Sequence, residues 1–257
     1  MTVSKGVALI TGASQGIGRA IAIGLATDGF DIALNDIPAR EAMLKRAAEE
    51  VASRGRRAHC VIADVSSEKQ VETMVSDAVH ALGGLDVMVA NAGVSMMRSL
   101  LDTTGEDLDR ILGVNLRGTF FCYKYAAMQM IAQGRGGRII GACSGTGKQG
   151  QASLSAYSAS KFGIRAITQC AALEFGGYGI TVNAYAPGPV KTPMWDDLEA
   201  GMGGPPGTLE EQLAKGAAVG YVGLPADIAA LVSFLASKES HLITGQSISI
   251  DGGRFFD

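Results

Sequence analysis

Short apolar runs alternate along the chain with longer stretches in which apolar residues recur every three or four positions. The runs are rich in β-branched residues and predict seven strands, at 7–11, 31–35, 58–63, 86–90, 138–142, 180–185 and 246–250. The stretches between them predict helices near 16–27, 39–53, 67–82, 107–132, 156–175 and 225–236. Alternation of buried strands with helices indicates βαβ units. The pattern therefore predicts a doubly wound α/β fold in which residues 1–257 form a single domain.

One segment interrupts this alternation. Residues 187–207, PGPVKTPMWDDLEAGMGGPPG, are rich in proline and glycine. A long irregular insertion in a compact domain usually serves as a lid or a mobile loop. We expect a substrate lid at about 188–220, in which Trp195, the only tryptophan, covers a small apolar substrate. The alternative is that Trp195 only packs within the lid or against a neighbouring subunit.

Composition narrows the possible partners and compartments. The formal net charge is −3 and the sequence pI is about 5.7, without a basic stripe, so a nucleic-acid partner is not expected. Four dispersed cysteines and three dispersed histidines predict reduced thiols and no metal site. No apolar run resembles a signal peptide or reaches the length of a membrane span. We therefore expect a cytoplasmic protein that binds a small molecule.

A glycine-rich loop follows the first predicted strand and opens the first predicted helix. Gly12, Gly16 and Gly18 have the spacing G-x-x-x-G-x-G in TGASQGIG. Glycines at this junction permit a tight turn and a close approach of the backbone to a pyrophosphate, while the helix N-terminus attracts the negative charge. The strand before the loop and the helix after it indicate a dinucleotide-binding site.

Asp36 stands at the end of the second predicted strand, 18 residues after Gly18. A carboxylate at this place accepts hydrogen bonds from ribose hydroxyls and repels a 2′-phosphate, which favours NAD over NADP. Asp36 is also suited to cap the next helix, which is a structural alternative to a role in cofactor binding. Nearby Arg40 offers a guanidinium to a 2′-phosphate, so NADP remains the alternative cofactor.

Tyr157 and Lys161 lie four residues apart among small residues, in SAYSASKFG. On a helix, side chains with this spacing lie one above the other on the same face. An ammonium beside a phenol favours the phenolate and lowers a pKa that is otherwise near 10. The pair predicts a general acid/base with its tuning cation.

With these two motifs and others in order, the chain resembles the short-chain dehydrogenase/reductase family over residues 5–253. The other motifs are DV at 64–65, NAG at 91–93, Asn115, Ser144, PGPVKT at 187–192 and ITGQSISIDGG at 243–253. The resemblance implies a Rossmann fold with a seven-stranded parallel sheet in the order 3-2-1-4-5-6-7, helices on both faces, and a homotetramer. It implies pairing of helices 107–132 and 156–175 between subunits; Phe255 and Phe256 are candidates for a second interface.

The same resemblance assigns a catalytic role to four residues. Tyr157 would be the acid/base and Lys161 its tuner, which also holds the nicotinamide ribose. Ser144 would bond the substrate oxygen, and Asn115 would hold a water that relays protons to Lys161. Taken alone, Ser144 is equally well explained as a loop residue and Asn115 as a buried polar residue. A non-catalytic dinucleotide sensor is disfavoured because all four positions are filled.

The cofactor contacts implied by the resemblance extend beyond the glycine loop and lie at the carboxyl ends of strands. Asp64 and Val65 would meet the adenine, Asn91, Ala92 and Gly93 would line the floor near the ribose, and the segment after the sixth strand would hold the carboxamide. The complete set is Gly12, Ser14, Gln15, Gly16, Ile17, Gly18, Asp36, Asp64, Val65, Asn91, Ala92, Gly93, Tyr157, Lys161, Pro187, Gly188, Val190, Thr192 and Met194.

The lid sequence and the ending DGGRFFD resemble the acetoin (diacetyl) reductase and 2,3-butanediol dehydrogenase branch. Members of that branch often carry Gln after the catalytic serine, to bond a second substrate oxygen, whereas this chain has Gly145. Gly145 leaves room for a larger substrate, unless Gln149, Gln151 or Ser153 replaces the missing group. A polyol or other secondary-alcohol dehydrogenase is therefore the alternative, followed by a 3-oxoacyl-carrier-protein reductase. The expected substrate contacts are Ser144, Gly145, Tyr157, Gly188 and Trp195.

Overall fold

The computed structural model describes residues 3–193, 195 and 207–256. Its centre is one sheet of seven strands, which pair in parallel in the order β3-β2-β1-β4-β5-β6-β7. This confirms the predicted fold class and strand order. The strands are β1 (Val7–Thr11), β2 (Asp31–Asp36), β3 (Ala58–Ile62), β4 (Val87–Ala90), β5 (Gly137–Ala142), β6 (Ile180–Pro187) and β7 (Ser247–Ile250).

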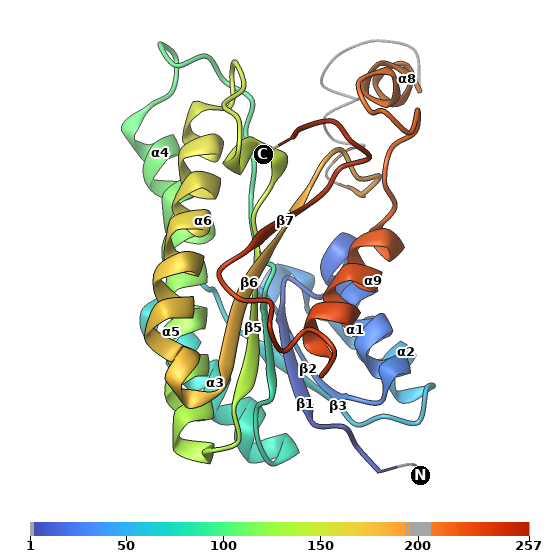
Figure 1. Cartoon of the computed structure of the whole chain (residues 1–257), viewed down its shortest axis with the longest axis vertical. Helices are drawn as coiled ribbons and strands as arrows, with labels where there is room; N and C mark the ends of the chain where they lie inside the picture. The colour runs from blue at the N-terminus through green and yellow to red at the C-terminus, as the bar shows by residue number, and fades with distance from the viewer. Residues whose placement is uncertain (1–2, 194, 196–206, 257) are drawn as a thin grey trace.

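Helices cover both faces of this sheet (Figure 1). α3, α5 and α6 pack on one face, where Met74, Tyr123 and Met130 belong to one buried core, and α1, α2 and α9 pack on the other with Ile21 and Leu44. None of the described helices is long and apolar enough to cross a membrane. The helices are α1 (Gly16–Asp28), η1 (Pro38–Arg40), α2 (Glu41–Ala52), α3 (Glu68–Leu82), α4 (Gly105–Leu112), η2 (Gly113–Arg117), α5 (Gly118–Gln133), η3 (Gly145–Gly147), α6 (Ser155–Phe175), η4 (Gly176–Tyr178), α8 (Thr208–Lys215) and α9 (Pro225–Ala236).

The helix predicted over 107–132 is built from three consecutive parts. It starts as α4, where Thr104 and Asp107 form a capping box: the Asp107 amide donates to Thr104 Oγ1 at 3.1 Å and the Thr104 amide to Asp107 Oδ2 at 3.1 Å. One π-helical turn, η2, then joins α4 to α5, and Asn115 lies inside this turn. Single π turns are frequent at functional sites because they shift the register of a helix.

The segment after β6 contains order that the sequence did not indicate. Val190 forms a parallel bridge with Gly223, and the Lys191 amide donates to the Gly223 carbonyl at 2.9 Å. α8, a helix of two turns, lies within the region expected to be a lid. Met194, one of the predicted cofactor contacts, and residues 196–206 lie outside the described part of the chain. The prediction missed α8 because this helix of eight residues, without proline or glycine, directly follows the proline- and glycine-rich stretch 187–207.

Candidate active site

The glycine loop connects the carboxyl end of β1 to α1 and requires its glycines. Gly12 and Gly16 have φ values of +64° and +54°, in the left-handed region that favours glycine. A Cβ at Gly18 would collide with the Gly12 carbonyl oxygen and lie 2.5 Å from Asn91 Nδ2. The loop is therefore packed closely on Asn91 and Ala92, the residues that follow β4.

Asn91 forms the floor beneath this loop. Its side-chain Nδ2 donates to the Thr11 carbonyl oxygen at 2.8 Å and to that of Gly12 at 3.2 Å, and its Oδ1 accepts from the Tyr185 hydroxyl at 2.8 Å. The buried Thr11 hydroxyl accepts from the amides of Asn91 and Ala92, both at 3.0 Å. Thr11 and Tyr185 fix this floor, and the sequence analysis overlooked both because each reads as an ordinary strand residue.

The residues of the loop fit a dinucleotide. Ser14 is 2% exposed, its Oγ has no hydrogen-bond partner among the described residues, and its amide donates to Asp36 Oδ2 at 3.2 Å. Gln15 is the N-cap of α1, and no side chain caps the helix there. Ile17 packs its side chain on the core behind the loop. A buried hydroxyl and open helix amides at a glycine turn provide hydrogen-bond donors for a phosphate.

Asp36 ends β2 at the edge of this cradle. Its Oδ1 accepts from the Ile37 amide at 2.9 Å. The alternative role as a helix cap is not found, because Ile37 and Arg40 are the N-cap residues of η1 and α2 and no side chain caps either helix. Arg40 places its guanidinium 3.6 Å from the sulfur of Met43. Arg19, the residue after Gly18, forms a two-pronged ion pair with Glu50, with nitrogen–oxygen distances of 3.0 and 2.5 Å.

The predicted adenine contacts, Asp64 and Val65, follow β3 but face different surroundings. Asp64 Oδ1 accepts from the amide of Ser66 at 2.9 Å and from its hydroxyl at 2.8 Å. Val65 is 5% exposed and packs against the start of α5, where a Cβ at Gly118 would lie 2.8 Å from its Cγ2. Its side chain is thus part of the core, which leaves mainly its backbone available to a ligand.

The predicted carboxamide segment begins where β6 ends. The Gly188 amide donates to the Ile250 carbonyl oxygen of β7 at 3.2 Å, and a Cβ at Gly188 would lie 2.8 Å from that of Asp251. Thr192 lies against the glycine loop, because a Cβ at Gly16 would be 3.6 Å from Thr192 Cγ2. Thr192 and the residues after β6 therefore lie along one side of the cradle.

Ser144, Tyr157 and Lys161 meet beside the cradle, at the carboxyl end of β5 and the start of α6. Ser144 caps η3, where its Oγ accepts from the Thr146 amide at 3.2 Å, and it forms a side-chain hydrogen bond with Tyr157. Lys161 is 3% exposed; its Nζ donates to the Ala142 carbonyl oxygen at 2.7 Å and lies 5.4 Å from the centre of the Tyr157 ring. The predicted stacking of phenol and ammonium is present.

Asn115 contacts this cluster through a residue that the sequence analysis did not single out. Its Nδ2 donates to the Val94 carbonyl oxygen at 2.9 Å and to Ser160 Oγ at 3.0 Å, and its Oδ1 accepts from the Val94 amide at 2.8 Å. Ser160 is fully buried and donates to the Tyr157 carbonyl oxygen at 2.7 Å. The Asn115 side chain is therefore fixed by the protein, and Ser160 links it to the backbone of Tyr157.

Burial controls the acidity of the two ionisable groups. It lowers the pKa of Lys161 to about 8, because removal from water disfavours the ammonium. It raises the pKa of Tyr157 to about 12, and the hydrogen bond from Ser144 offsets only part of that rise. The lowered pKa expected for Tyr157 is therefore not found in this structure, because desolvation is the largest influence on the phenol.

The residues expected to contact substrate show a second departure. The space beside Gly145 is not empty: the Phe255 ring occupies it, and a Cβ at Gly145 would lie 2.5 Å from Phe255 Cδ2. Phe255 thus packs within its own chain, whereas Phe256 remains 87% exposed. Trp195 is 6% exposed, and its amide donates to the Thr192 carbonyl oxygen at 2.8 Å, so the residue is packed within its own chain. Gln149 and Ser153 are exposed.

Comparisons with known proteins agree with this geometry. The family model described as enoyl-(acyl carrier protein) reductase matches residues 12–254. A short-chain dehydrogenase/reductase of Armillaria gallica is 63% identical over 100% of this chain and 98% of its own length. The chain belongs to the short-chain dehydrogenase/reductase family. An L-2,3-butanediol dehydrogenase of Corynebacterium glutamicum is 41% identical over 98% of this chain and 99% of its own. The crystal structure of an acetoin dehydrogenase from Enterobacter cloacae matches with a TM-score of 0.87 at 33% identity, covering 98% of this chain and 96% of that one.

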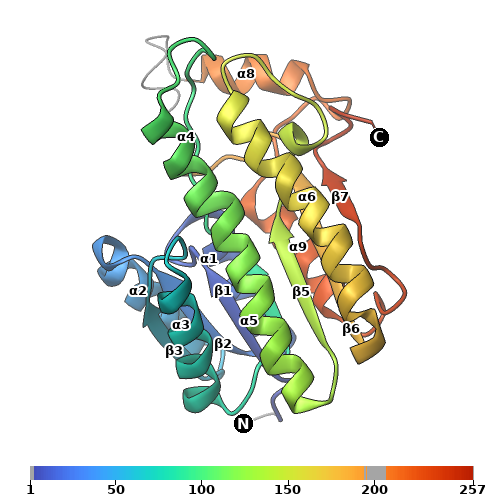
Figure 2. The ribbon, with the colours of Figure 1, turned by 90° about the vertical axis from the view of Figure 1, so that its left-hand side faces the viewer.

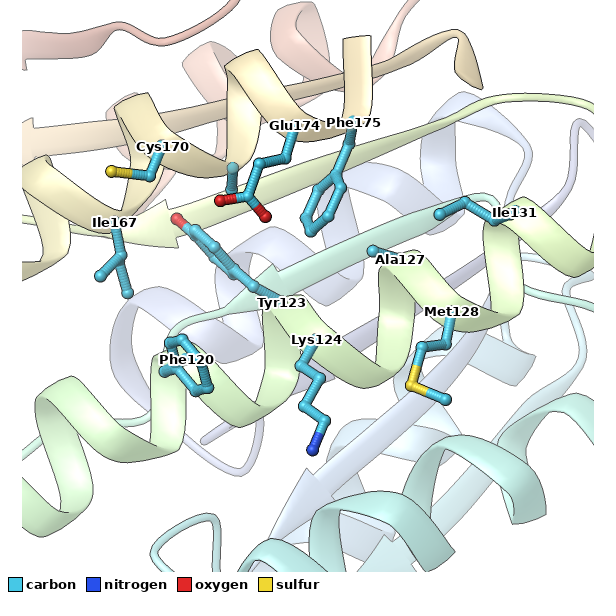
Figure 3. Close-up of a pocket in the computed structure, with 11 residues that line it drawn as sticks. Phe120, Tyr123, Lys124, Ala127, Met128, Ile131, Ile167, Cys170, Glu174 and Phe175 are labelled. Carbon is cyan, nitrogen blue, oxygen red and sulfur yellow. The ribbon is translucent and has the colours of Figure 1, made fainter. Parts of the chain in front are cut away.

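Family membership makes this an oxidoreductase, and a largely apolar hollow lies between α5 and α6. α5 and α6 run side by side on the outside of the molecule (Figure 2). Side chains of both helices line a hollow between them (Figure 3). The lining residues are Phe120, Tyr123, Lys124, Ala127, Met128, Ile131, Ile167, Cys170, Ala171, Glu174 and Phe175. Phe120 and Met128 are at least half exposed, so apolar surface remains open there.

Proposed function

We propose that this protein transfers a hydride between NAD and a secondary alcohol or ketone. The observation that carries the proposal is the meeting of Ser144 and Tyr157, two hydroxyl side chains, above a buried lysine, beside a glycine cradle suited to a dinucleotide. When bound, the nicotinamide supplies or accepts the hydride. The protein must then supply an acid or base for the substrate oxygen and groups that hold the reactants in place.

In the reducing direction, the substrate carbonyl oxygen accepts hydrogen bonds from Tyr157 and Ser144. Tyr157 donates its proton as negative charge develops on that oxygen, and Ser144 stabilises this charge. Lys161, held by the Ala142 carbonyl oxygen, keeps a cation under the phenol and has further donors for a ribose hydroxyl. Asn115 acts as a positioning residue through Ser160; a relay water at Asn115 stays a prediction.

Asp36 supports NAD as the cofactor because its carboxylate stands at the edge of the cradle, and Arg19 is paired with Glu50. We expect Asp36→Ser to lower kcat/KM with NAD about tenfold and to raise it with NADP, since a 2′-phosphate would no longer meet a carboxylate. Steady-state kinetics with both cofactors measure the ratio. Asp109→Ser, at an exposed position of α4, is the matched control. A ratio that stays the same in both variants would contradict the assignment.

Acetoin, diacetyl and 2,3-butanediol are the substrates we propose first, supported by the names of the relatives given above. The region 188–220 with α8 would act as the substrate lid. A panel of these compounds, polyols and simple 2-alkanones, assayed with NAD and NADH, tests the proposal. We expect turnover of the acetoin group at least tenfold above that of polyols. Faster turnover of polyols would replace our first choice, and absence of activity on all members would overturn the proposed reaction.

The hollow on α5 and α6 supports the proposed homotetramer. Its lining is mostly apolar and is continuous along two parallel helices, which suits pairing with the same surface of a second copy. Sedimentation velocity of the full chain tests this association, and a monomer at assay concentration would contradict it.

A further inference from the structure

The residues after β7 form a turn that their own aspartate organises. Asp251 Oδ1 accepts from the amides of Gly253 at 2.9 Å and Arg254 at 3.3 Å, and its Oδ2 accepts from the amide of Phe255 at 3.0 Å. Ile250, just before the turn, pairs with the start of the predicted carboxamide segment through Gly188. The Asp251 carboxylate and the Ile250 carbonyl oxygen thus hold the end of the chain at the carboxyl ends of β6 and β7 (Figure 1).

This turn places the Phe255 ring against Gly145, the residue after Ser144. A Cβ at Gly145 would lie 2.5 and 2.6 Å from Phe255 Cδ2 and Cε2, and 3.6 Å from the Pro187 carbonyl oxygen. Only glycine at position 145 is compatible with the ring in this place, because real Cβ atoms do not approach so closely. Phe255 is half-buried, and its ring lies against the residue that follows Ser144.

Arg254 connects the same turn to the segment around α8. Its Nη1 donates to the Leu213 carbonyl oxygen at 3.0 Å, and its guanidinium carbon lies 5.7 Å from the centre of the Phe255 ring. The Val219 amide, after α8, donates to the Gly252 carbonyl oxygen at 3.1 Å. The Phe255 ring therefore lies between Gly145 on one side and the Arg254 guanidinium, which is bonded to the α8 segment, on the other.

We propose that Phe255 determines substrate specificity by forming an apolar wall of the substrate pocket next to Ser144. This inference rests on the proposed function and narrows its substrate class. The ring has no hydrogen-bond donor or acceptor, and a polar group pressed against it would lose hydrogen bonds to water. The enzyme would therefore select secondary alcohols and ketones that turn a hydrocarbon substituent, and not a second oxygen, toward position 145.

Removing the ring tests this role. In Phe255→Ala we expect kcat/KM for butan-2-one to fall about tenfold, mainly through KM, while octan-2-one loses less or gains, because the freed space admits a longer chain. The selectivity between the two ketones should shift at least fivefold. Phe256→Ala, which removes the exposed neighbouring ring, is the matched control and should keep the wild-type ratio. The KM for NADH should not change in either variant.

The outcomes separate this inference from the proposed function. Wild-type protein without activity on any ketone or alcohol would overturn both. Active wild-type protein with the same ratio in Phe255→Ala and Phe256→Ala would overturn only the role of Phe255. If Phe255→Ala does not fold, Phe255→Leu replaces it, because leucine keeps apolar volume while it changes the shape of the wall. An unchanged selectivity between the two ketones in Phe255→Leu would then overturn the role of Phe255.

A second pair of variants tests the contact itself. Gly145→Ala should impair ketone reduction, because its methyl group collides with the ring, and Gly145→Ala combined with Phe255→Ala should recover activity relative to Gly145→Ala alone. Recovery in the double variant supports the proposed wall. Full activity of Gly145→Ala with Phe255 in place would show that the ring does not stand there in the working enzyme.

Discussion

Replacing Tyr157 with phenylalanine is expected to lower kcat for ketone reduction by about 10²- to 10⁴-fold, the range typical of a lost general acid. The substitution removes one oxygen atom and leaves the ring, so the cradle and the packing of α6 should persist. We therefore expect the KM for NADH and the unfolding midpoint to stay close to those of the wild type. Single-turnover kinetics and NADH fluorescence measure the chemical step and the binding separately.

The pH dependence gives this prediction a direction. Because the pKa of Tyr157 is raised to about 12, its hydroxyl carries a proton throughout the neutral range. It can therefore donate that proton to the substrate oxygen during ketone reduction at pH 7. Alcohol oxidation needs the phenolate, so its rate should rise as the pH increases from 7 toward 10. In Tyr157→Phe, the remaining oxidation should lose this dependence on pH.

Tyr178→Phe is the matched control because it makes the same change at an exposed position in η4. It should keep both the rate and the pH profile of the wild type. Equal activity of Tyr157→Phe and Tyr178→Phe would remove Tyr157 from the role of acid.

The sequence predicted the sheet and the cradle because both depend on local patterns. Apolar runs with β-branched residues identified all seven strands to within one or two residues. The glycines of the loop were recognisable because local backbone geometry requires them. Either φ is positive, as at Gly12 and Gly16, or another backbone segment lies too close for a side chain, as at Gly18. Family resemblance supplied the strand order, which local patterns do not contain.

The environment of the predicted catalytic groups could not be inferred from local patterns. The spacing of Tyr157 and Lys161 indicates that they share a helix face, but the sequence does not tell how deeply each is buried. That depth reverses the expected shift for Tyr157, because desolvation dominates when a charged form leaves water. Ser160 escaped notice for a related reason, since a serine in a helix reads as a small spacer until its two partners are known.

Contacts between distant segments were the least predictable part of the site. Gly145 appeared to open space for a larger substrate, whereas Phe255, 110 residues later, fills it. Two residues so far apart meet only because β5 and β7 end at the same edge of the sheet, on either side of β6. The space that a side chain at position 145 would fill is thus occupied by an aromatic ring.

Replacing Lys161 with methionine is expected to raise the free energy of unfolding at pH 7 while it removes activity. Burial lowers the pKa of Lys161 from 10.5 to about 8, which corresponds to about 3 kcal/mol of cost for holding the ammonium in the folded protein. Methionine keeps most of the apolar stem and removes the charge, but it also removes the hydrogen bond to the Ala142 carbonyl oxygen. We therefore expect a net gain of about 1–2 kcal/mol, measured by urea unfolding.

The gain should depend on pH in a defined direction. Below pH 8, Lys161 is charged in both the folded and the unfolded protein, so the full cost is present. Between pH 8 and 10.5 the folded protein releases this proton while the unfolded chain keeps it, so wild-type stability rises relative to the variant. Above 10.5 both forms are neutral and the charge no longer contributes to the difference.

Lys69→Met provides the control at a side chain that is 82% exposed, where removing a surface charge should change stability by less than about 0.5 kcal/mol at any of these pH values. If Lys161→Met is less stable than the wild type at pH 7, the hydrogen bond to Ala142 outweighs desolvation. If Lys161→Met is more stable than the wild type but inactive, the protein keeps a destabilising buried cation because the reaction requires it. Stability and activity are expected to oppose each other at a site of this kind.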